Sequence, residues 1–278
     1  MKIVITAGHN KSLHAIALMN NLKENGHEIV GCVQIRTFQL KRLRKYIKQY
    51  GWETVKAKFK SHILADEYTY LANETKPIKE YLKNRKISVS SINSYCKKEN
   101  IENIKLNTIN DKKFENFLTK KEAYLIVYAG GGIIRNNIIE KTKYGVLNAH
   151  SGWLPFFRGM NVIEWALLYG FRPYTTVHLI DAGIDTGRIL FKESIPLAND
   201  LYTIRGNATV HNVELLTKII NNFSSYLNNS IHQEIKEGKQ FFVMHTRLKN
   251  LVSKFLENKQ PDINEKLKNN SPDALRFK

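Results

Sequence analysis

The sequence predicts an α/β protein whose sheet is mostly parallel, in a Rossmann-like arrangement with helices on both faces. Residues 2–6 form an apolar, β-branched run, a stretch with apolar residues at helical spacing follows, and residues 27–33 form a second apolar run. A strand, a helix and a second strand in this order require parallel pairing and a sheet that is covered on both faces. Residues 123–129 are continuously apolar, which is typical of a central parallel strand.

The other elements are predicted in chain order from the same two periodicities. Ser12 is expected to cap the first helix and Gly26 to end it. Apolar residues at helical spacing predict further helices at 38–62 with a break near Gly51, 91–100, 111–119, 135–142, 160–169, 202–227 and 248–256. Short apolar runs predict further strands at 104–106, 145–149, 175–180 and 189–195. Residues 231–245 are expected to form a hairpin that turns at Gly238-Lys239.

Composition excludes several classes of protein. The chain has 278 residues, of which 42% are hydrophobic, and this share is too high for a disordered chain. Cys32 and Cys96 are the two cysteines, so neither a disulfide framework nor a multi-cysteine zinc site is expected, and Cys32 is expected in the core. The apolar runs are far shorter than the ~18 residues that a membrane span needs, and the apolar stretch in residues 1–8 is too short for a signal peptide. We therefore expect a globular, cytoplasmic protein without a membrane partner.

The positive charge is concentrated in one segment. The formal net charge is +18, and residues 36–60 hold nine basic residues against the single acid Glu53, whereas residues 151–200 hold four basic and five acidic groups. Such an excess is typical of proteins that bind a nucleic acid or another polyanion. A lysine-rich, solvated surface is the alternative, and composition alone does not separate the two.

A dense group of polar residues lies at and after the expected strand 145–149. Asn148 and His150 are two positions apart at its carboxyl end, so their side chains should point to the same face. Ligands bind at the carboxyl ends of strands in open α/β sheets. A carboxamide and an imidazole there can donate two hydrogen bonds to a developing oxyanion, and a carboxylate such as Asp185 would favour the protonated imidazole. The alternative is that these polar side chains only form hydrogen bonds with the backbone where the strand ends and the loop begins.

The wider pattern is Asn-x-His, then Leu-Pro, then Gly, and then an Asp in a loop that ends Asp-x-Gly. It stands at 148–150, 154–155, 159 and 185–187, with 35 positions from His150 to Asp185. This pattern resembles the folate-dependent formyltransferase family, which includes glycinamide ribonucleotide transformylase, methionyl-tRNA formyltransferase and the sugar N-formyltransferases. The sequence departs from the family at Gly152, where a Ser is frequent, which puts any hydroxyl role there in doubt. The resemblance implies a formyltransferase domain over residues 1–200, with a basic helical insertion at 36–62, and a mainly helical extension over 201–278.

The resemblance also implies a reaction and roles for the polar residues. A formyl group would pass from N10-formyltetrahydrofolate to a primary amine, with no metal ion. Asn148 would hold the formyl oxygen, His150 would stabilise the tetrahedral intermediate or take the amine proton, and Asp185 would orient and charge the imidazole. The residues implied to bind the folate are Gly130, Gly131, Gly132, Ile133, Ile134, Asp181 and Gly183. Three successive glycines allow a flat ring close to the backbone, although a plain tight turn uses the same residues.

Residues for the acceptor are expected in two places. Residues 7–12 lie between a strand and a helix N-terminus, so Asn10 and Lys11 are candidates for binding a phosphate, with a routine helix cap as the alternative. Trp153, Arg158 and Gly159 lie inside the motif and are further candidates, and Trp153 is equally suited to packing. The glycine spacing of residues 7–12 is not that of a dinucleotide-binding or phosphate-binding loop, which argues against an oxidoreductase. The remaining histidines lack metal-ligand spacing and are expected at the surface or in ordinary hydrogen bonds; they include His9, His14, His27 and His178.

Three classes of acceptor are open. A nucleotide-linked amino sugar is expected, because sugar N-formyltransferases join a catalytic domain of this size to a variable C-terminal extension that often helps dimerisation, and a diphosphate suits a basic protein. The resemblance thus implies a homodimer and a place in lipopolysaccharide O-antigen biosynthesis. Methionyl-tRNA would explain the basic segment but requires a strand-rich C-terminal barrel, and glycinamide ribonucleotide or another small amine is the third class. A nucleic acid is therefore not the expected partner, and a binding module without turnover is the remaining alternative.

Overall fold

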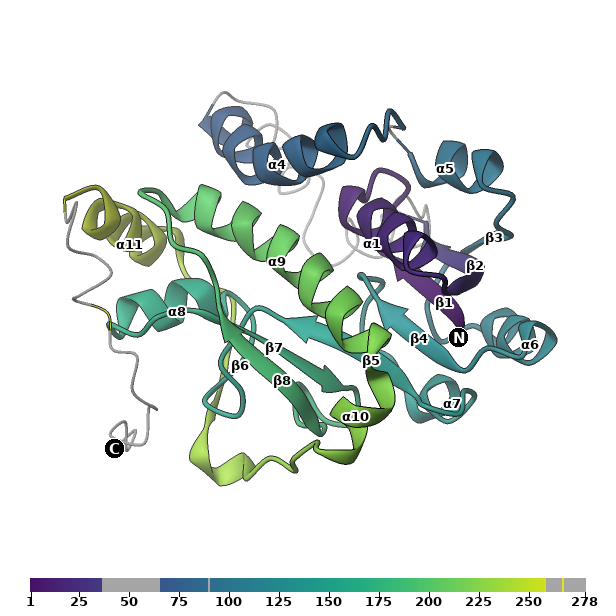
Figure 1. Cartoon of the computed structure of the whole chain (residues 1–278). Helices are drawn as coiled ribbons and strands as arrows, with labels where there is room; N and C mark the ends of the chain where they lie inside the picture. Colours follow the sequence, from purple (N-terminus) through teal and green to yellow (C-terminus); the bar gives the residue numbers. More distant parts are fainter. Residues whose placement is uncertain (37–65, 90, 259–266, 268–278) are drawn as a thin grey trace, which may run out of the picture.

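A seven-stranded sheet forms the centre of the protein (Figure 1). The computed structural model describes residues 1–36, 66–89, 91–258 and 267. The first five strands in sheet order are parallel, and β7 runs antiparallel to both of its neighbours. In sheet order the strands are β3 (Asn103–Leu106), β2 (Glu28–Ile35), β1 (Lys2–Ala7), β4 (Leu125–Tyr128), β5 (Val146–His150), β7 (Tyr174–Leu179) and β8 (Ile189–Ser194). The mostly parallel α/β sheet is as predicted.

Helices cover both faces of this sheet, each over its own apolar cluster. The first face packs against α1 (Leu13–Glu24), α4 (Asp66–Asn84), α5 (Ile92–Lys98), α9 (Leu201–Asn221) and α10 (Phe223–Asn228). The opposite face packs against α6 (Lys112–Lys121) and α7 (Asn136–Ile139). The side chains of Ile3 and Ile5 enter the first cluster and that of Val4 enters the second, because successive residues of a strand point to opposite faces. Both strand faces are therefore apolar, as a central parallel strand requires.

Local signals set the helix boundaries that the sequence predicts. The side chain of Ser12 accepts a hydrogen bond from the backbone N–H of Ala15, so Ser12 caps α1 as expected. Asp111 and Asp200 cap α6 and α9 in the same way. The predicted helix 202–227 divides at Asn222 into α9 and α10.

Helix α4 is absent from the sequence prediction because its residues are mostly polar and Pro77 lies inside it. It packs along α9, as Figure 1 shows. Gly206 of α9 makes this packing close, since a Cβ atom there would lie 2.6 Å from the carbonyl oxygen of Glu74 and 2.8 Å from Pro77. The basic insertion predicted at 36–62 lies almost entirely outside the described residues.

The predicted hairpin at 231–245 is wrong. Residues Ile235–Glu237 form a short 3-10 helix, and β9 (Lys239–Phe241) pairs in parallel with β6 (Phe157–Gly159) to form a separate two-stranded sheet. The two strands can approach each other because of two glycines. A Cβ atom at Gly238 would overlap the backbone of Pro155, and one at Gly159 would overlap the backbone of Phe241. The apolar run in this segment is therefore paired across the chain instead of locally.

The segment after residue 200 does not stand apart from the sheet. Helix α9 contributes Leu215, Leu216 and Ile219 to the first apolar cluster. A further cluster joins α8 (Val162–Leu168), the start of α9 and α11 (Thr246–Asn258). The domain boundary at residue 200 stays a prediction, and in the structure α9 is part of the helical layer on the sheet. Among the residues that the structure describes, no helix combines the length and apolar character needed to cross a bilayer.

Candidate active site

Asn148 and His150 lie on β5, and the chain brings Asp185 to them from the loop between β7 and β8. Asn148 stands beside Tyr128, the last residue of β4, in the parallel register, so this group lies where β4 ends. The carboxylate oxygen Oδ2 of Asp185 is 3.5 Å from Nδ1 of His150. The structure thus brings together the three residues that the sequence singles out.

Hydrogen bonds orient the His150 ring. Its Nε2 is 3.0 Å from the carbonyl oxygen of Phe157, and because a carbonyl only accepts, Nε2 carries a proton and donates it. Nδ1 is therefore the ring nitrogen that faces the Asp185 carboxylate. Since the separation of 3.5 Å is longer than a good hydrogen bond, Nδ1 is the ring nitrogen that is available for exchanging a proton with a reactant.

Gly152 explains the departure from the family pattern. A Cβ atom at this position would overlap Nε2 of His150 and the carbonyl oxygen of Phe157, the two atoms of the hydrogen bond just described. A serine does not fit there without moving the imidazole. The neighbouring Ser151 hydroxyl instead accepts a hydrogen bond from Asn212 at 3.1 Å.

His178 is a member of the site that sequence reasoning missed. It pairs with Asn148 across β5 and β7, and its Nε2 is 3.1 Å from Nδ2 of Asn148 and 3.7 Å from Oδ1 of Asp185. Burial, and to a lesser degree the neighbouring His150, lowers the pKa of His178 from 6.5 to about 4. The ring is therefore neutral at pH 7, donates from Nδ1 to the carbonyl oxygen of Leu179 at 2.9 Å and accepts at Nε2 from Asn148.

These contacts leave the Asn148 carboxamide oriented for a further partner. One N–H of Nδ2 is fixed on His178, and the second N–H has no hydrogen-bond partner among the described residues. Asn148 and protonated His150 can thus offer two donors to one oxyanion. The expectation of a site without metal stays a prediction.

The backbone of Asp185 is held in an unusual conformation. Its φ of 54° lies in the left-handed region, which residues other than glycine, asparagine and aspartate rarely adopt. Its Oδ2 accepts a hydrogen bond of 2.9 Å from the backbone N–H of Gly159, on β6. The turn before it is closed by Asp181, whose Oδ1 accepts from Thr186 at 2.6 Å and from Gly183 at 3.1 Å. The carboxylate of Asp181 is therefore engaged within its own loop.

The glycine loop after β4 has an open conformation that only glycines adopt easily, since Gly130, Gly131 and Gly132 have φ values of 113°, 134° and 98°. The Oη of Tyr128 lies 3.1 Å from both the N and the O of Gly132 and braces the loop. Burial raises the pKa of this phenol, and the nearby Asp185 charge adds to the shift, so the hydroxyl keeps its proton.

The two isoleucines of this loop face opposite ways. Ile133 is 75% exposed, whereas Ile134 is buried in the apolar cluster beneath α6 and α7. The wall that both residues are expected to supply for a folate ring is therefore reduced to Ile133. Ile184, on the loop that carries Asp185, is 42% exposed and offers a second apolar side chain.

The residues proposed for the acceptor are placed in different surroundings. The side chain of Asn10 accepts a hydrogen bond from the backbone N–H of Asn93, so it holds the start of α5. Trp153 is buried and its ring packs 4.1 Å from that of Tyr174, which makes it a packing residue. The guanidinium of Arg158 donates to the carbonyl oxygens of Ile235 and Gly238, both at 3.4 Å. Lys11 is exposed and lines a cavity.

That cavity has a volume of about 620 Å³ and lies between the β1–α1 loop and α4. Its cationic side chains come from Lys11 and Lys79, and its apolar wall from Leu13, Ile78 and Leu82. Because the loop follows the carboxyl end of β1, this cavity opens on the same edge of the sheet as Asn148 and His150.

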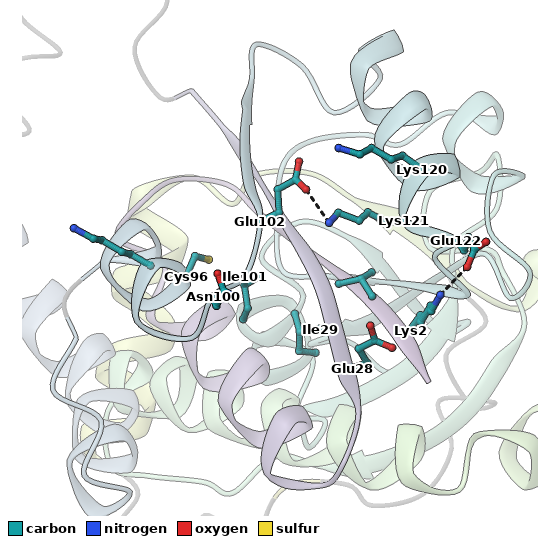
Figure 2. A pocket seen from close by; sticks show the side chains of 12 residues that line it. Lys2, Glu28, Ile29, Cys96, Asn100, Ile101, Glu102, Lys120, Lys121 and Glu122 are labelled. Atoms are coloured by element: carbon teal, nitrogen blue, oxygen red, sulfur yellow. Dashed lines mark hydrogen bonds and ion pairs between the residues drawn. The ribbon is translucent and has the colours of Figure 1, made fainter.

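A second cavity, of about 880 Å³, lies at the opposite edge, beside the amino ends of the parallel strands. Figure 2 shows that two of its lysines are held in ion pairs, Lys2 with Glu122 at 2.6 Å and Lys121 with Glu102 at 2.7 Å. The cavity has no imidazole in its lining. It is distant from the candidate catalytic group, and its size alone does not make it an active site.

An α/β sheet in which a carboxamide and an imidazole of β5 meet an imidazole of β7 and a carboxylate of the following loop defines a site for acid–base and oxyanion chemistry. The model of the formyl transferase family matches residues 1–215, and the chain therefore belongs to this family. Methionyl-tRNA formyltransferase of Clostridium beijerinckii is 29% identical over 193 residues, or 67% of this chain and 61% of that protein. The same enzyme of Clostridium tetani is 31% identical over 194 residues, or 66% of this chain and 55% of that protein. The chain thus spans 55–61% of the length of these two relatives.

Solved structures show the same fold. Glycinamide ribonucleotide transformylase 1 from Symbiobacterium toebii has a TM-score of 0.53 and 15% identity, with 81% of this chain and 88% of that chain covered. A sugar N-formyltransferase from Shewanella has a TM-score of 0.52 and 13% identity, with 91% and 86% covered. The predicted formyltransferase fold is confirmed.

Proposed function

We propose that this protein transfers a formyl group from N10-formyltetrahydrofolate to a primary amine. The observation that carries the proposal is the group formed by Asn148, His150 and Asp185, with a separation of 3.5 Å between the imidazole and the carboxylate, in a chain of the formyl transferase family. The group supplies two hydrogen-bond donors and one proton-exchanging nitrogen. These are the groups that attack of an amine on a formyl carbon requires.

The roles of the three residues follow from the charges that develop. When the amine nitrogen forms a bond to the formyl carbon, negative charge moves to the formyl oxygen and positive charge to the nitrogen. The free N–H of Asn148 and the protonated His150 stabilise the oxyanion. Nδ1 of His150 gives its proton to N10 and then takes a proton from the amine nitrogen, which restores the imidazolium. The bond from carbon to N10 breaks as the oxyanion returns to a carbonyl. Asp185 stabilises the imidazolium form of His150 at the start and the end of this exchange.

The two loops beside this group are proposed to hold the folate. The open backbone of Gly130, Gly131 and Gly132 leaves peptide groups accessible to a flat ring, and Ile133 and Ile184 offer exposed apolar side chains. Asp181 and Gly183 contribute through the backbone, since the Asp181 carboxylate already holds the turn.

The proposed acceptor is a nucleotide-linked amino sugar. The cavity beside the β1–α1 loop supports this choice, because Lys11 and Lys79 can bind a diphosphate at the N-terminus of α1 while Leu13 and Ile78 offer an apolar wall to a base. The segment after residue 200 is also mainly helical, with α9, α10 and α11, where a tRNA enzyme is expected to carry a strand-rich barrel.

Methionyl-tRNA is the second candidate acceptor. It is favoured by the curated relatives named above, which are methionyl-tRNA formyltransferases, and by the concentration of basic residues in 36–60.

A panel assay separates the candidates. The protein is incubated with N10-formyltetrahydrofolate and, in separate reactions, with nucleotide-linked 3-amino and 4-amino sugars, methionyl-tRNA and glycinamide ribonucleotide, and formylated product is measured. We expect turnover with a nucleotide-linked amino sugar. Turnover with methionyl-tRNA alone would contradict the proposed acceptor but keep formyl transfer, whereas failure to bind 5-formyltetrahydrofolate in calorimetry would contradict formyl transfer itself.

The acceptor cavity is tested by two lysine variants. Lys11→Ala and Lys79→Ala should raise the KM for the acceptor about 10-fold or more each and leave the KM for the folate unchanged, because a charge-assisted hydrogen bond is worth roughly 1.5–3 kcal/mol. Lys97→Ala and Lys120→Ala, in the cavity at the opposite edge, are the matched controls and should change neither constant. Equal effects of all four changes would contradict this location.

A further inference from the structure

The chain beyond the matched family region returns to the candidate active site. The side-chain nitrogen Nε2 of Gln233 donates to two backbone carbonyl oxygens, that of Asp185 at 3.1 Å and that of Gly187 at 2.6 Å. Both acceptors are carbonyls, so the orientation of the carboxamide is fixed by them. Gln233 lies outside residues 1–215, which the family model matches, and no sequence motif points to it.

The segment that carries Gln233 is anchored on both sides of the site. On one side, Ile231 exchanges two backbone hydrogen bonds of 2.9 Å with Ile189, the first residue of β8. On the other side, β9 pairs with β6, which presents the Phe157 carbonyl to His150 and the Gly159 N–H to Asp185. Gln233 therefore lies between two fixed points of the backbone.

The contact falls where Asp185 needs support. Its left-handed backbone at φ 54° costs free energy for any residue with a Cβ atom, although aspartate tolerates it better than most, and it persists where the surroundings hold it. The Gly159 N–H holds the carboxylate, and Gln233 holds the peptide carbonyl of the same residue. Without the donors of Gln233 the backbone of Asp185 can turn toward an ordinary φ, which takes the carboxylate away from Nδ1 of His150.

We propose that Gln233 is a positioning residue for formyl transfer, which acts by fixing the backbone of Asp185 so that the carboxylate faces His150. The inference rests on the proposed role of Asp185 in the reaction. It predicts that the effect of removing Gln233 depends on whether the Asp185 carboxylate is present.

A double-mutant cycle measures this dependence. Gln233→Leu, Asp185→Asn and the double variant are compared with the unmodified protein in single-turnover formyl transfer, with the acceptor that gives product in the panel. Gln233→Leu should lower the rate about 10-fold to 10²-fold in the unmodified background, since misplacement of a reacting group by ~1 Å has an effect of this order. In the Asp185→Asn background the same change should lower the rate less than about 2-fold, because residues that act as a unit are not additive.

A matched control removes a similar hydrogen bond from the same segment. Nε1 of Trp165 donates to the carbonyl oxygen of Phe242 at 3.0 Å, so Trp165→Phe removes one donor to the C-terminal segment while keeping an aromatic ring. This variant should keep the rate within about 2-fold. Gln233→Glu replaces the donor with an acceptor at nearly constant size. It takes the place of Gln233→Leu in the cycle if Gln233→Leu lowers the melting temperature strongly.

The imidazole resonances of the protein alone provide a readout that does not need an acceptor. In Gln233→Leu and Gln233→Glu the ¹⁵N signals of His150 and His178 should move, and in Trp165→Phe they should stay. Equal rate losses from Gln233→Leu in both backgrounds, or unchanged imidazole signals, would overturn the positioning role. If Asp185→Asn itself keeps the full rate, the catalytic role of Asp185 fails first, and this result is distinct from an additive cycle.

Discussion

At the scale of single residues, the site depends on a histidine that is kept neutral beside one that can be charged. His178 is buried and accepts a hydrogen bond from Asn148, whereas His150 faces the carboxylate of Asp185. Their ring centroids are 6.3 Å apart, so protonating both would place two like charges close together in a buried site. The neutral His178 thus fixes which N–H of Asn148 is free.

The depressed pKa of His178 predicts a pH dependence of stability. The unfolded chain takes up a proton on this residue below pH 6.5, whereas the folded protein does so only near pH 4, so the free energy of unfolding should fall as the pH decreases between these values. The loss attributable to His178 is up to about 3 kcal/mol, at about 1.4 kcal/mol per pKa unit.

Urea denaturation between pH 7 and pH 4.5 measures this effect. His178→Gln should show a shallower decrease than the unmodified protein, and His232→Gln, at an exposed position, should keep the original slope. Identical slopes for His178→Gln and the unmodified protein would show that the imidazole is not kept neutral by the fold. His14, whose pKa burial also lowers to about 4, should contribute a further decrease.

At the scale of elements, the small sheet of β6 and β9 connects the C-terminal segment to the site. Met160 donates its backbone N–H to the carbonyl oxygen of Phe241 at 3.0 Å, and Lys239 donates to that of Phe156 at 3.0 Å. The rings of Phe157 and Phe241 stack with centroids 5.3 Å apart. Since β6 contacts both His150 and Asp185, disturbing this pairing should reach the catalytic group.

Gly159→Ala tests the pairing. The φ of Gly159 is 95°, and an added Cβ would overlap the carbonyl oxygen of Phe241, so both strain and overlap are expected. Gly170 also has a positive φ, of 77°, but nothing lies within 4 Å of an added Cβ, which makes Gly170→Ala the matched control. Overpacking typically adds about 1–3 kcal/mol, so Gly159→Ala should be less stable than Gly170→Ala by this amount in chemical denaturation and slower in formyl transfer. Equal stabilities would mean that β6 and β9 can separate without loss.

Periodicity predicts most of the central sheet and its covering helices, because apolar residues at spacings of two and of 3.6 report burial directly. It fails at β9, since whether Phe241 pairs within its own segment or with β6 is decided by glycines far apart in the sequence. It also fails at α4, whose polar residues and Pro77 hide a helix that packs on α9.

The residues of the candidate site also fall into those that the sequence predicts and those that it does not. Asn148, His150 and Asp185 stand out by spacing, and the structure places them together. His178 and Gln233 act through contacts with strands and loops that are distant in the chain, which no local spacing reports. The alternation of residues in the predicted strand 175–180, antiparallel to 145–149, is the signal that could have placed His178 opposite Asn148.

At the scale of the whole molecule, the segment that holds much of the excess positive charge is different from the segments that hold the candidate catalytic residues. The net charge is +18, and residues 36–60 account for +8 of it, in a segment that lies almost entirely outside the described residues. The catalytic group itself contains one carboxylate and one imidazole that can be charged together. The charge is therefore expected to affect how an acidic acceptor is captured and not how the formyl group is transferred.

A salt titration tests this division. The KM for a nucleotide-linked acceptor should rise between 0.1 M and 1 M salt, over which the screening length falls from about 10 Å to about 3 Å, while kcat stays constant. Replacing Lys41, Arg42, Arg44 and Lys45 with serine should raise the KM at low salt and flatten this dependence. If the KM of both proteins responds to salt alike, the basic segment is a solvated surface without a role in capture.

The most direct test of the proposed reaction is single-turnover formyl transfer from N10-formyltetrahydrofolate by Asn148→Ala, His150→Ala and Asp185→Ala. Each change should lower the rate about 10²–10³-fold, as removal of an oxyanion donor typically does, while circular dichroism and the melting temperature show an intact fold. Near-normal rates in any two of these folded variants would contradict the assignment of this group as the catalytic centre.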